Sequence, residues 1–132
     1  MITIPISTVN LSTILEMIGE NESCWSVLHI WAISKPNSKL DIFELEGKTK
    51  ADYGYQVDWQ SLFSLSAQLD QINECTIIAV DSLELLPDRG LSLESLREIC
   101  DVVIEAVDST GWEISVKDIS LSKKLKKELT AV

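Results

Sequence analysis

The longest hydrophobic stretch of the chain runs from Cys24 to Ser34, where polar residues occur only singly. Alternate residues of a strand point to opposite faces of a sheet, and both alternating sets of this stretch are mostly apolar. We therefore expect a central strand that is covered on both faces. Trp25 and Trp31 are expected in the core. The pattern does not decide whether Trp59 and Trp112 lie in the core or at an interface.

Hydrophobic periodicities of about 2 and 3.6 residues divide the rest of the chain into shorter elements. A strand at 39–47 is expected to form a hairpin with the first one, and a helix capped by Asp58 is expected to extend to Ile72. The remaining predicted elements are an edge strand at 3–7, a helix at 11–18 capped by Asn10 or Ser12, a short buried strand at 75–80, a helix capped by Ser92 that extends to about 110, a strand at 112–117, and a final helix that opens at Ser120 or Ser122.

The order of these elements predicts the fold class. Helices and strands are mixed without the strict alternation of a doubly wound parallel sheet. We expect residues 1–132 to form a single acidic α+β domain, with a mixed or mainly antiparallel sheet of four to five strands and three to four packed helices.

The net charge of the chain limits the kinds of partner that it can bind. There are 11 Lys and Arg against 21 Asp and Glu, a net charge of -10. Nucleic acids and anionic membrane surfaces would be repelled, so neither is expected as a partner. Residues 51–116 hold 13 acidic and 2 basic side chains, a net charge of -11, and this field favours a basic protein partner.

A candidate partner-binding surface lies in the same acidic segment, where aromatic residues occur among the carboxylates. Tyr and Trp contribute much of the binding energy at interfaces, and charge accelerates the encounter. The alternative is a solvated face that only keeps the protein soluble. The candidate residues are Asp52, Tyr53, Tyr55, Asp58 and Trp59, joined by Asp81, Glu84 and Asp88 if the strand ending at Val80 brings their loop close.

The chain has few residues that could carry catalysis. His29 is the only histidine, the three cysteines are far apart, and the five glycines are isolated, so no catalytic, metal or cofactor residue is assigned. The cysteines are expected to be buried free thiols. Lys123, Lys124, Lys126 and Lys127 lie near a helix C-terminus, where positive charge is favourable.

Two features indicate the compartment. The first residues lack the basic start and the long apolar core of a signal peptide, and no apolar stretch approaches the length of a membrane span. Unpaired cysteines fit a reducing environment. A cytoplasmic protein of undetermined oligomeric state is expected.

The C-terminal part of the sequence carries a resemblance. The stretch Val103-Ile104-Glu105-Ala106-Val107-Asp108-Ser109-Thr110-Gly111-Trp112-Glu113-Ile114, followed by Lys117-Asp118 and a tail rich in Lys and Leu, is similar to small cytosolic immunity proteins of bacterial polymorphic or contact-dependent toxin systems. The resemblance covers about 25 residues and identifies no functional residue. It implies a non-catalytic protein that binds and blocks one cognate toxin.

Three functions are therefore weighed. The leading hypothesis is an immunity or inhibitor protein that covers a basic toxin, such as a nuclease, with an acidic aromatic surface. The second is an acidic secretion chaperone or adaptor, and the third is a small enzyme that uses a cysteine or paired carboxylates.

Overall fold

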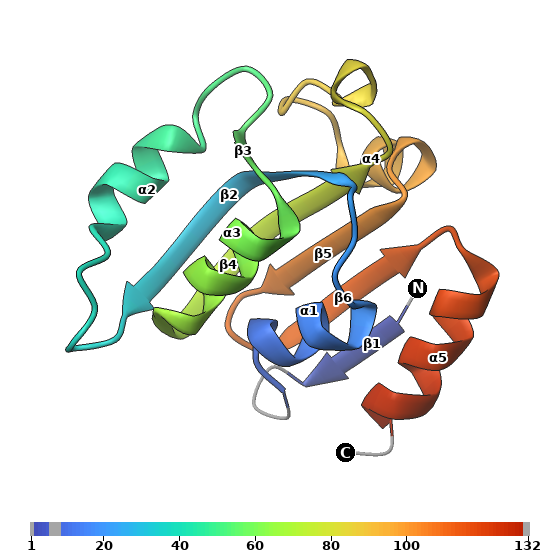
Figure 1. Ribbon diagram of the computed structural model, residues 1–132, viewed down its shortest axis with the longest axis horizontal. Helices are drawn as coiled ribbons and strands as arrows, with labels where there is room; N and C mark the ends of the chain where they lie inside the picture. The colour runs from blue at the N-terminus through green and yellow to red at the C-terminus, as the bar shows by residue number, and fades with distance from the viewer. Residues whose placement is uncertain (1, 6–8, 131–132) are drawn as a thin grey trace.

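The computed structural model describes residues 2–5 and 9–130 of the chain. This part forms one sheet with helices on both of its faces (Figure 1). In chain order the elements are β1 (Ile2–Pro5), α1 (Leu11–Ile18), β2 (Cys24–Ser34), α2 (Ile42–Lys48), β3 (Tyr55–Val57), α3 (Trp59–Ala67), β4 (Leu69–Val80), the 3₁₀ turn η1 (Leu83–Leu85), α4 (Leu93–Ile99), β5 (Val102–Val107), β6 (Gly111–Val116) and α5 (Ile119–Thr130).

The sheet has the strand order β1-β6-β5-β4-β2-β3, and every pair of neighbours is antiparallel. This confirms the α+β class and the mainly antiparallel sheet. The described chain has six strands and five α-helices, however, which is more than the predicted four to five strands and three to four helices. The predicted edge strand is present as β1, and residues 6 and 7 of that prediction lie outside the described residues.

Two hydrophobic cores lie on the two faces of the sheet. Helices α1, α3 and α5 lie in front of the sheet in Figure 1 and cover the larger core. Helix α4 and turn η1 cover a smaller core on the other face, near the end of β4. The smaller core consists of Leu28, Ile78, Val80, Leu86, Leu96, Cys100 and Val103.

Side-chain caps position most helix starts. Asn10, Asp58 and Ser92 each accept a hydrogen bond from a backbone N–H in the first turn of α1, α3 and α4, which is the interaction that begins a helix. Asp118 accepts the corresponding bond from Leu121 N at 2.8 Å in α5. The predicted caps at Asp58 and Ser92 are therefore confirmed, Asn10 rather than Ser12 is the cap of α1, and α5 begins slightly before Ser120.

The predicted hairpin strand at 39–47 is wrong, because residues 42–48 form helix α2. The carboxylate of Asp41 accepts hydrogen bonds from the N–H groups of Phe43 and Glu44, and Lys48 pairs with Glu44 at 3.4 Å one turn later. These local interactions stabilise a helix although apolar and polar residues alternate here as they would in a strand. Only Leu45 of the helix is buried.

The predicted helix from 92 to about 110 is also wrong in its second half. Helix α4 ends at Ile99, and Val102–Val107 form the interior strand β5. Residues 102–106 are all buried, so the stretch lacks the polar face of a surface helix. Leu69 and Ile72 likewise belong to β4 rather than to the preceding helix.

Strand β2 has its predicted bounds, but only part of it is covered on both faces. The pairing with β4 is irregular between Val27 and His29, which is a β-bulge, and such a bulge changes the face to which later residues point. Beyond it, Ile30 and Ala32 enter the larger core, while Trp31 is 54 % exposed. The predicted burial of Trp31 is thus wrong.

The other tryptophans lie against the core. Trp25 and Trp112 are 1 % exposed, and Trp59 packs partly buried against the larger core. All three cysteines are free, and Cys75 and Cys100 are buried as predicted, whereas Cys24 is only half-buried because it lies at the first position of β2. Every helix in the described residues is too short or too polar to cross a bilayer.

Candidate functional site

Two loops meet at one edge of the sheet and form a single surface. One loop joins α2 to β3 and the other joins β4 to α4, and they lie side by side at the top of Figure 1. The backbone N–H of Arg89 donates a hydrogen bond to the carbonyl of Asp52 at 3.0 Å. We call six exposed residues of these loops the two-loop surface: Asp52, Tyr53, Leu83, Glu84, Leu85 and Asp88. The same loops also expose two basic residues, Lys50 and Arg89.

The first loop is held to the sheet through its backbone. The hydroxyl of Ser26, which is fully buried on β2, donates to the carbonyl of Tyr53. Gly54 N donates to the carbonyl of Ala51 at 2.9 Å. The φ of Gly54 is +76°, and a Cβ at this position would lie 2.7 Å from the carbonyl oxygen of Val27. Only glycine therefore fits where the loop enters β3.

The second loop is anchored in the smaller core. Leu86 is 8 % exposed and packs there, just after the turn η1. The guanidinium of Arg89 donates to the carbonyl of Leu28 on β2 at 3.1 Å. Asp88 accepts a hydrogen bond from Gly90 N at 2.9 Å. Both loops are consequently tied to β2 at neighbouring positions, which gives the surface a defined shape.

The two-loop surface presents apolar side chains between carboxylates. Tyr53 is 49 % exposed, Leu83 is 62 % exposed and Leu85 is 54 % exposed. Asp52, Glu84 and Asp88 are exposed as well. None of the ion pairs found in the described residues involves these three carboxylates. They are available to cationic groups of a partner, and the apolar side chains can be covered by it.

Leu83 and Leu85 are members of this surface that the sequence reasoning did not identify. They lie in the stretch Asp81-Ser82-Leu83-Glu84-Leu85-Leu86, where leucines alternate with carboxylates within a predicted loop. Leu86 satisfies the local need for an anchor in the core. Leu83 and Leu85 are not needed for that contact with the core. Their presence in a loop was the feature of the sequence that could have identified them as surface residues.

The eight predicted site residues do not all gather on the two-loop surface. Asp52, Tyr53, Glu84 and Asp88 do. Asp81 instead lines a hollow of about 300 Å³ between the sheet and helices α1 and α5, together with Asp101 and Asp118.

Asp58 and Trp59 have structural roles at the start of α3. The carboxylate of Asp58 accepts a hydrogen bond from Ser61 N at 2.7 Å, and this bond lowers the pKa of Asp58. The indole N–H of Trp59 donates to the carbonyl of Leu15 at 3.2 Å, and its ring stacks on Phe63 with centroids 5.0 Å apart. The Trp59 contacts fix α3 against α1, while Asp58 caps α3 and remains exposed.

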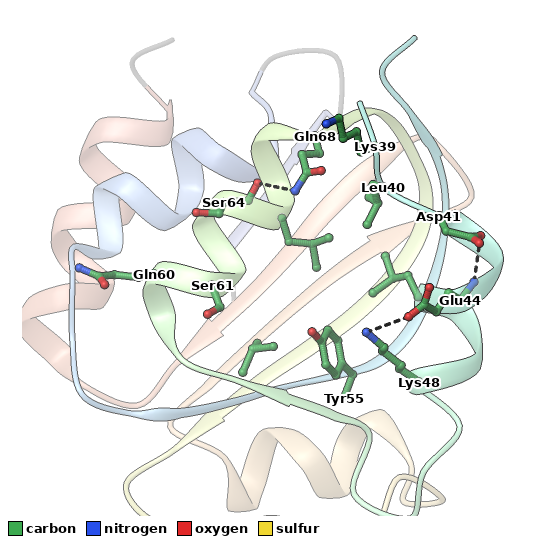
Figure 2. A pocket seen from close by; sticks show the side chains of 13 residues that line it. Lys39, Leu40, Asp41, Glu44, Lys48, Tyr55, Gln60, Ser61, Ser64 and Gln68 are labelled. Atoms are coloured by element: carbon green, nitrogen blue, oxygen red, sulfur yellow. Dashed lines mark hydrogen bonds and ion pairs between the residues drawn. The ribbon is translucent and has the colours of Figure 1, made fainter. Parts of the chain in front are cut away.

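Tyr55 points into a separate cleft between α2 and α3 (Figure 2). The cleft has a volume of about 650 Å³ and an apolar floor that includes Leu45 and Leu65. The ammonium of Lys48 lies 5.2 Å from the centre of the Tyr55 ring and also pairs with Glu44. Two of the charged groups that line this cleft, Lys48 and Glu44, are thus paired with each other.

The two buried cysteines are poor candidates for a nucleophile. Burial raises the pKa of Cys75 to about 12 and that of Cys100 to about 11, so both thiols stay protonated and weakly nucleophilic at neutral pH. His29 is hydrogen-bonded to Glu74 at 3.1 Å and lines neither the cleft nor the two-loop surface. In the part of the chain that the structure describes, no three His, Cys, Asp or Glu residues are arranged to hold a metal ion.

Comparisons with known proteins give no relative from which a function could be inferred: no family model matches the sequence, and no curated protein or solved structure is significantly similar to the chain.

Proposed function

We propose that this protein is a binding protein of the inhibitor or immunity type, which blocks a basic protein, such as a toxin nuclease, by covering it with the two-loop surface. The observation that carries this proposal is the hydrogen bond between Arg89 and Asp52, because it joins the two loops into one anchored surface. That surface combines exposed apolar groups with unpaired carboxylates.

The mechanism is occlusion. Asp52, Glu84 and Asp88 pair with lysine or arginine side chains of the partner, which in a nuclease would otherwise hold phosphate. Tyr53 and the two leucines of η1 fill neighbouring apolar pockets. The net charge of -10 steers the encounter, so association is fast at low salt and slows as salt screens the charges.

The resemblance of the C-terminal sequence to immunity proteins supports the same function. An enzyme receives less support, since the two buried thiols have raised pKa values and the large cleft is lined by no histidine or cysteine.

The test is co-expression with the product of the neighbouring reading frame, followed by purification through a tag on this protein. We expect a complex whose association rate falls as salt is raised. The triple variant Asp52→Asn, Glu84→Gln, Asp88→Asn should lower that rate at low salt by about tenfold or more. A matched variant that neutralises the exposed Glu16, Asp70 and Glu98 removes the same charge elsewhere. Failure to co-purify, or equal effects of the two triple variants, would contradict the proposal.

A further inference from the structure

Half of one sheet face is left without a helix. Helix α4 and turn η1 cover this face only where β2 begins and β4 ends. The uncovered half, which we call the open sheet face, is turned away from the viewer in Figure 1. Its members are His29, Trp31 and Ile33 on β2, Glu74 and Thr76 on β4, Glu105 on β5 and Glu113 on β6.

The strand register aligns the polar members in one row across the sheet. His29 pairs with Thr76, Thr76 with Glu105, and Glu105 with Glu113. Residues directly opposite on neighbouring antiparallel strands point to the same face. The four side chains therefore lie next to one another on the open sheet face.

Apolar side chains lie beside this row. Trp31 and Ile33 are 54 % and 51 % exposed and alternate with buried residues on β2, so they share one face. A lone exposed hydrophobic residue needs no explanation. Two large neighbours on an uncovered sheet face are different, because burying them on a partner would remove substantial apolar area from water.

The charge of the open sheet face is negative. It carries three carboxylates, of which Glu74 and Glu113 are partly exposed and Glu105 is only 8 % exposed. Two basic groups are already engaged, since His29 lies 3.1 Å from Glu74 and Arg97 of α4 lies 3.7 Å from Glu113. A second copy of this chain, with a net charge of -10, would be repelled, whereas a basic surface is complementary.

The open sheet face is continuous with the two-loop surface. A hollow of about 310 Å³ is lined by Trp31, His29 and Glu74 and also by Lys50 and Arg89 from the two loops. Stable interfaces usually bury roughly 800 Å² per partner and about 20–30 residues a side. The two-loop surface has six residues, well below that number, so a tight partner needs additional area next to it.

We propose that the basic partner covers the open sheet face together with the two-loop surface, with Trp31 and Ile33 as apolar anchors and with a lysine or arginine seated against Glu74 and Glu105. This inference rests on the proposed function and extends its contact area. A second hollow, of about 210 Å³ and lined by both of these carboxylates and Thr76, offers the space for that side chain.

Binding of a cation in this second hollow is coupled to the loss of a proton from Glu105. Burial raises the pKa of Glu105, and the hydrogen bond and the charge of Glu113 raise it further, with a smaller contribution from Glu74. Arg97 acts in the opposite direction, and His29 faces the same hollow. A cation beside Glu105 favours its ionised form, so binding should release protons, and more of them as the pH falls toward the range where Glu105 is protonated.

The test maps the contact by NMR on the ¹⁵N-labelled full chain. The probe is a short end-blocked peptide of alternating arginine and leucine, and a peptide of alternating glutamate and leucine is the charge control. We expect the basic peptide to shift the amide signals of the open sheet face, at residues 29–33, 73–76, 105–107 and 113, together with those of the two loops, at residues 52–54 and 83–91. Trp31→Ala should weaken its affinity by about tenfold or more. Phe43→Ala is the matched control, because Phe43 is 84 % exposed on α2 and outside the proposed contact.

The outcomes separate this inference from the proposed function. Shifts confined to the two loops would overturn the extension and leave the two-loop surface in place. Shifts confined to the open sheet face, with no complex formed by the neighbouring gene product, would uphold the face and contradict the proposed function. Shifts spread evenly over all carboxylates, or no shifts at all, would overturn the inference.

Discussion

Replacement of Gly54 by alanine tests whether the first loop of the two-loop surface is fixed to the sheet. Gly54 has a φ of +76°, and an added Cβ would lie 2.5 Å from Ser26 Oγ and 2.7 Å from the carbonyl oxygen of Val27. A side chain could rotate away, but the carbonyl belongs to the backbone of β2. The loop or the strand must therefore move.

The size of the effect follows from two contributions. A left-handed backbone costs an alanine roughly 1–2 kcal/mol, and forcing an extra methyl into a packed site costs about 1–3 kcal/mol. We expect Gly54→Ala to lower the free energy of unfolding by about 3 kcal/mol. For a domain of this size that corresponds to a drop in Tm of roughly 10 °C.

The assay is urea and thermal unfolding, with Gly90→Ala as the matched control in the second loop. At Gly90 the nearest atom to an added Cβ is Asp88 Oδ1 at 3.4 Å, an ordinary contact, so this variant should unfold within about 0.5 kcal/mol of the parent protein. If Gly54→Ala were as stable as Gly90→Ala, the loop would not be held against β2 as described.

Three further predictions concern other residues. Asp58→Ala should lower the Tm by a few degrees, since it removes the cap of α3, and should leave partner affinity unchanged; a loss of affinity without a change in Tm would reassign Asp58 to the interface. Alkylation of the native protein at neutral pH, followed by mass spectrometry, should modify the half-buried Cys24 and spare Cys75 and Cys100, whose pKa values are about 12 and about 11; rapid labelling of either would revive the enzyme hypothesis. Because the pKa of Glu105 is raised in the folded state, folding takes up a proton, and stability should decline as the pH rises above its ordinary pKa of 4.5; Glu105→Gln should reduce this decline in urea unfolding measured across pH, and an unchanged slope would contradict the assignment.

Sequence reasoning was reliable where one local signal and the tertiary environment agreed. The strand bounds of β2 and the caps at Asn10, Asp58 and Ser92 are such cases, because hydrophobic content or a capping side chain acts within a few residues. It failed for residues 39–47, where an apolar alternation coincides with a capped helix. It also failed for β5, since a stretch buried on both faces has no period that separates strand from helix.

Only part of the candidate site could be predicted, because its local residues are visible in the sequence and its tertiary contacts are not. The acidic and aromatic character of Asp52 and Tyr53 is visible in the sequence, but their proximity to Glu84 and Asp88 depends on a backbone hydrogen bond between distant loops. The exposure of Trp31 depends on a bulge in β2, which no pattern of hydrophobic residues reveals. The open sheet face could therefore be recognised only from the fold.

Hydrogen exchange of this protein, alone and with the product of the neighbouring reading frame, tests the central claim most directly. If the partner covers the two-loop surface, the amides of residues 52–54 and 83–91 should exchange more slowly in the complex. Those lining the cleft between α2 and α3 should be unaffected. Protection confined to that cleft, or none in either loop, would contradict the account.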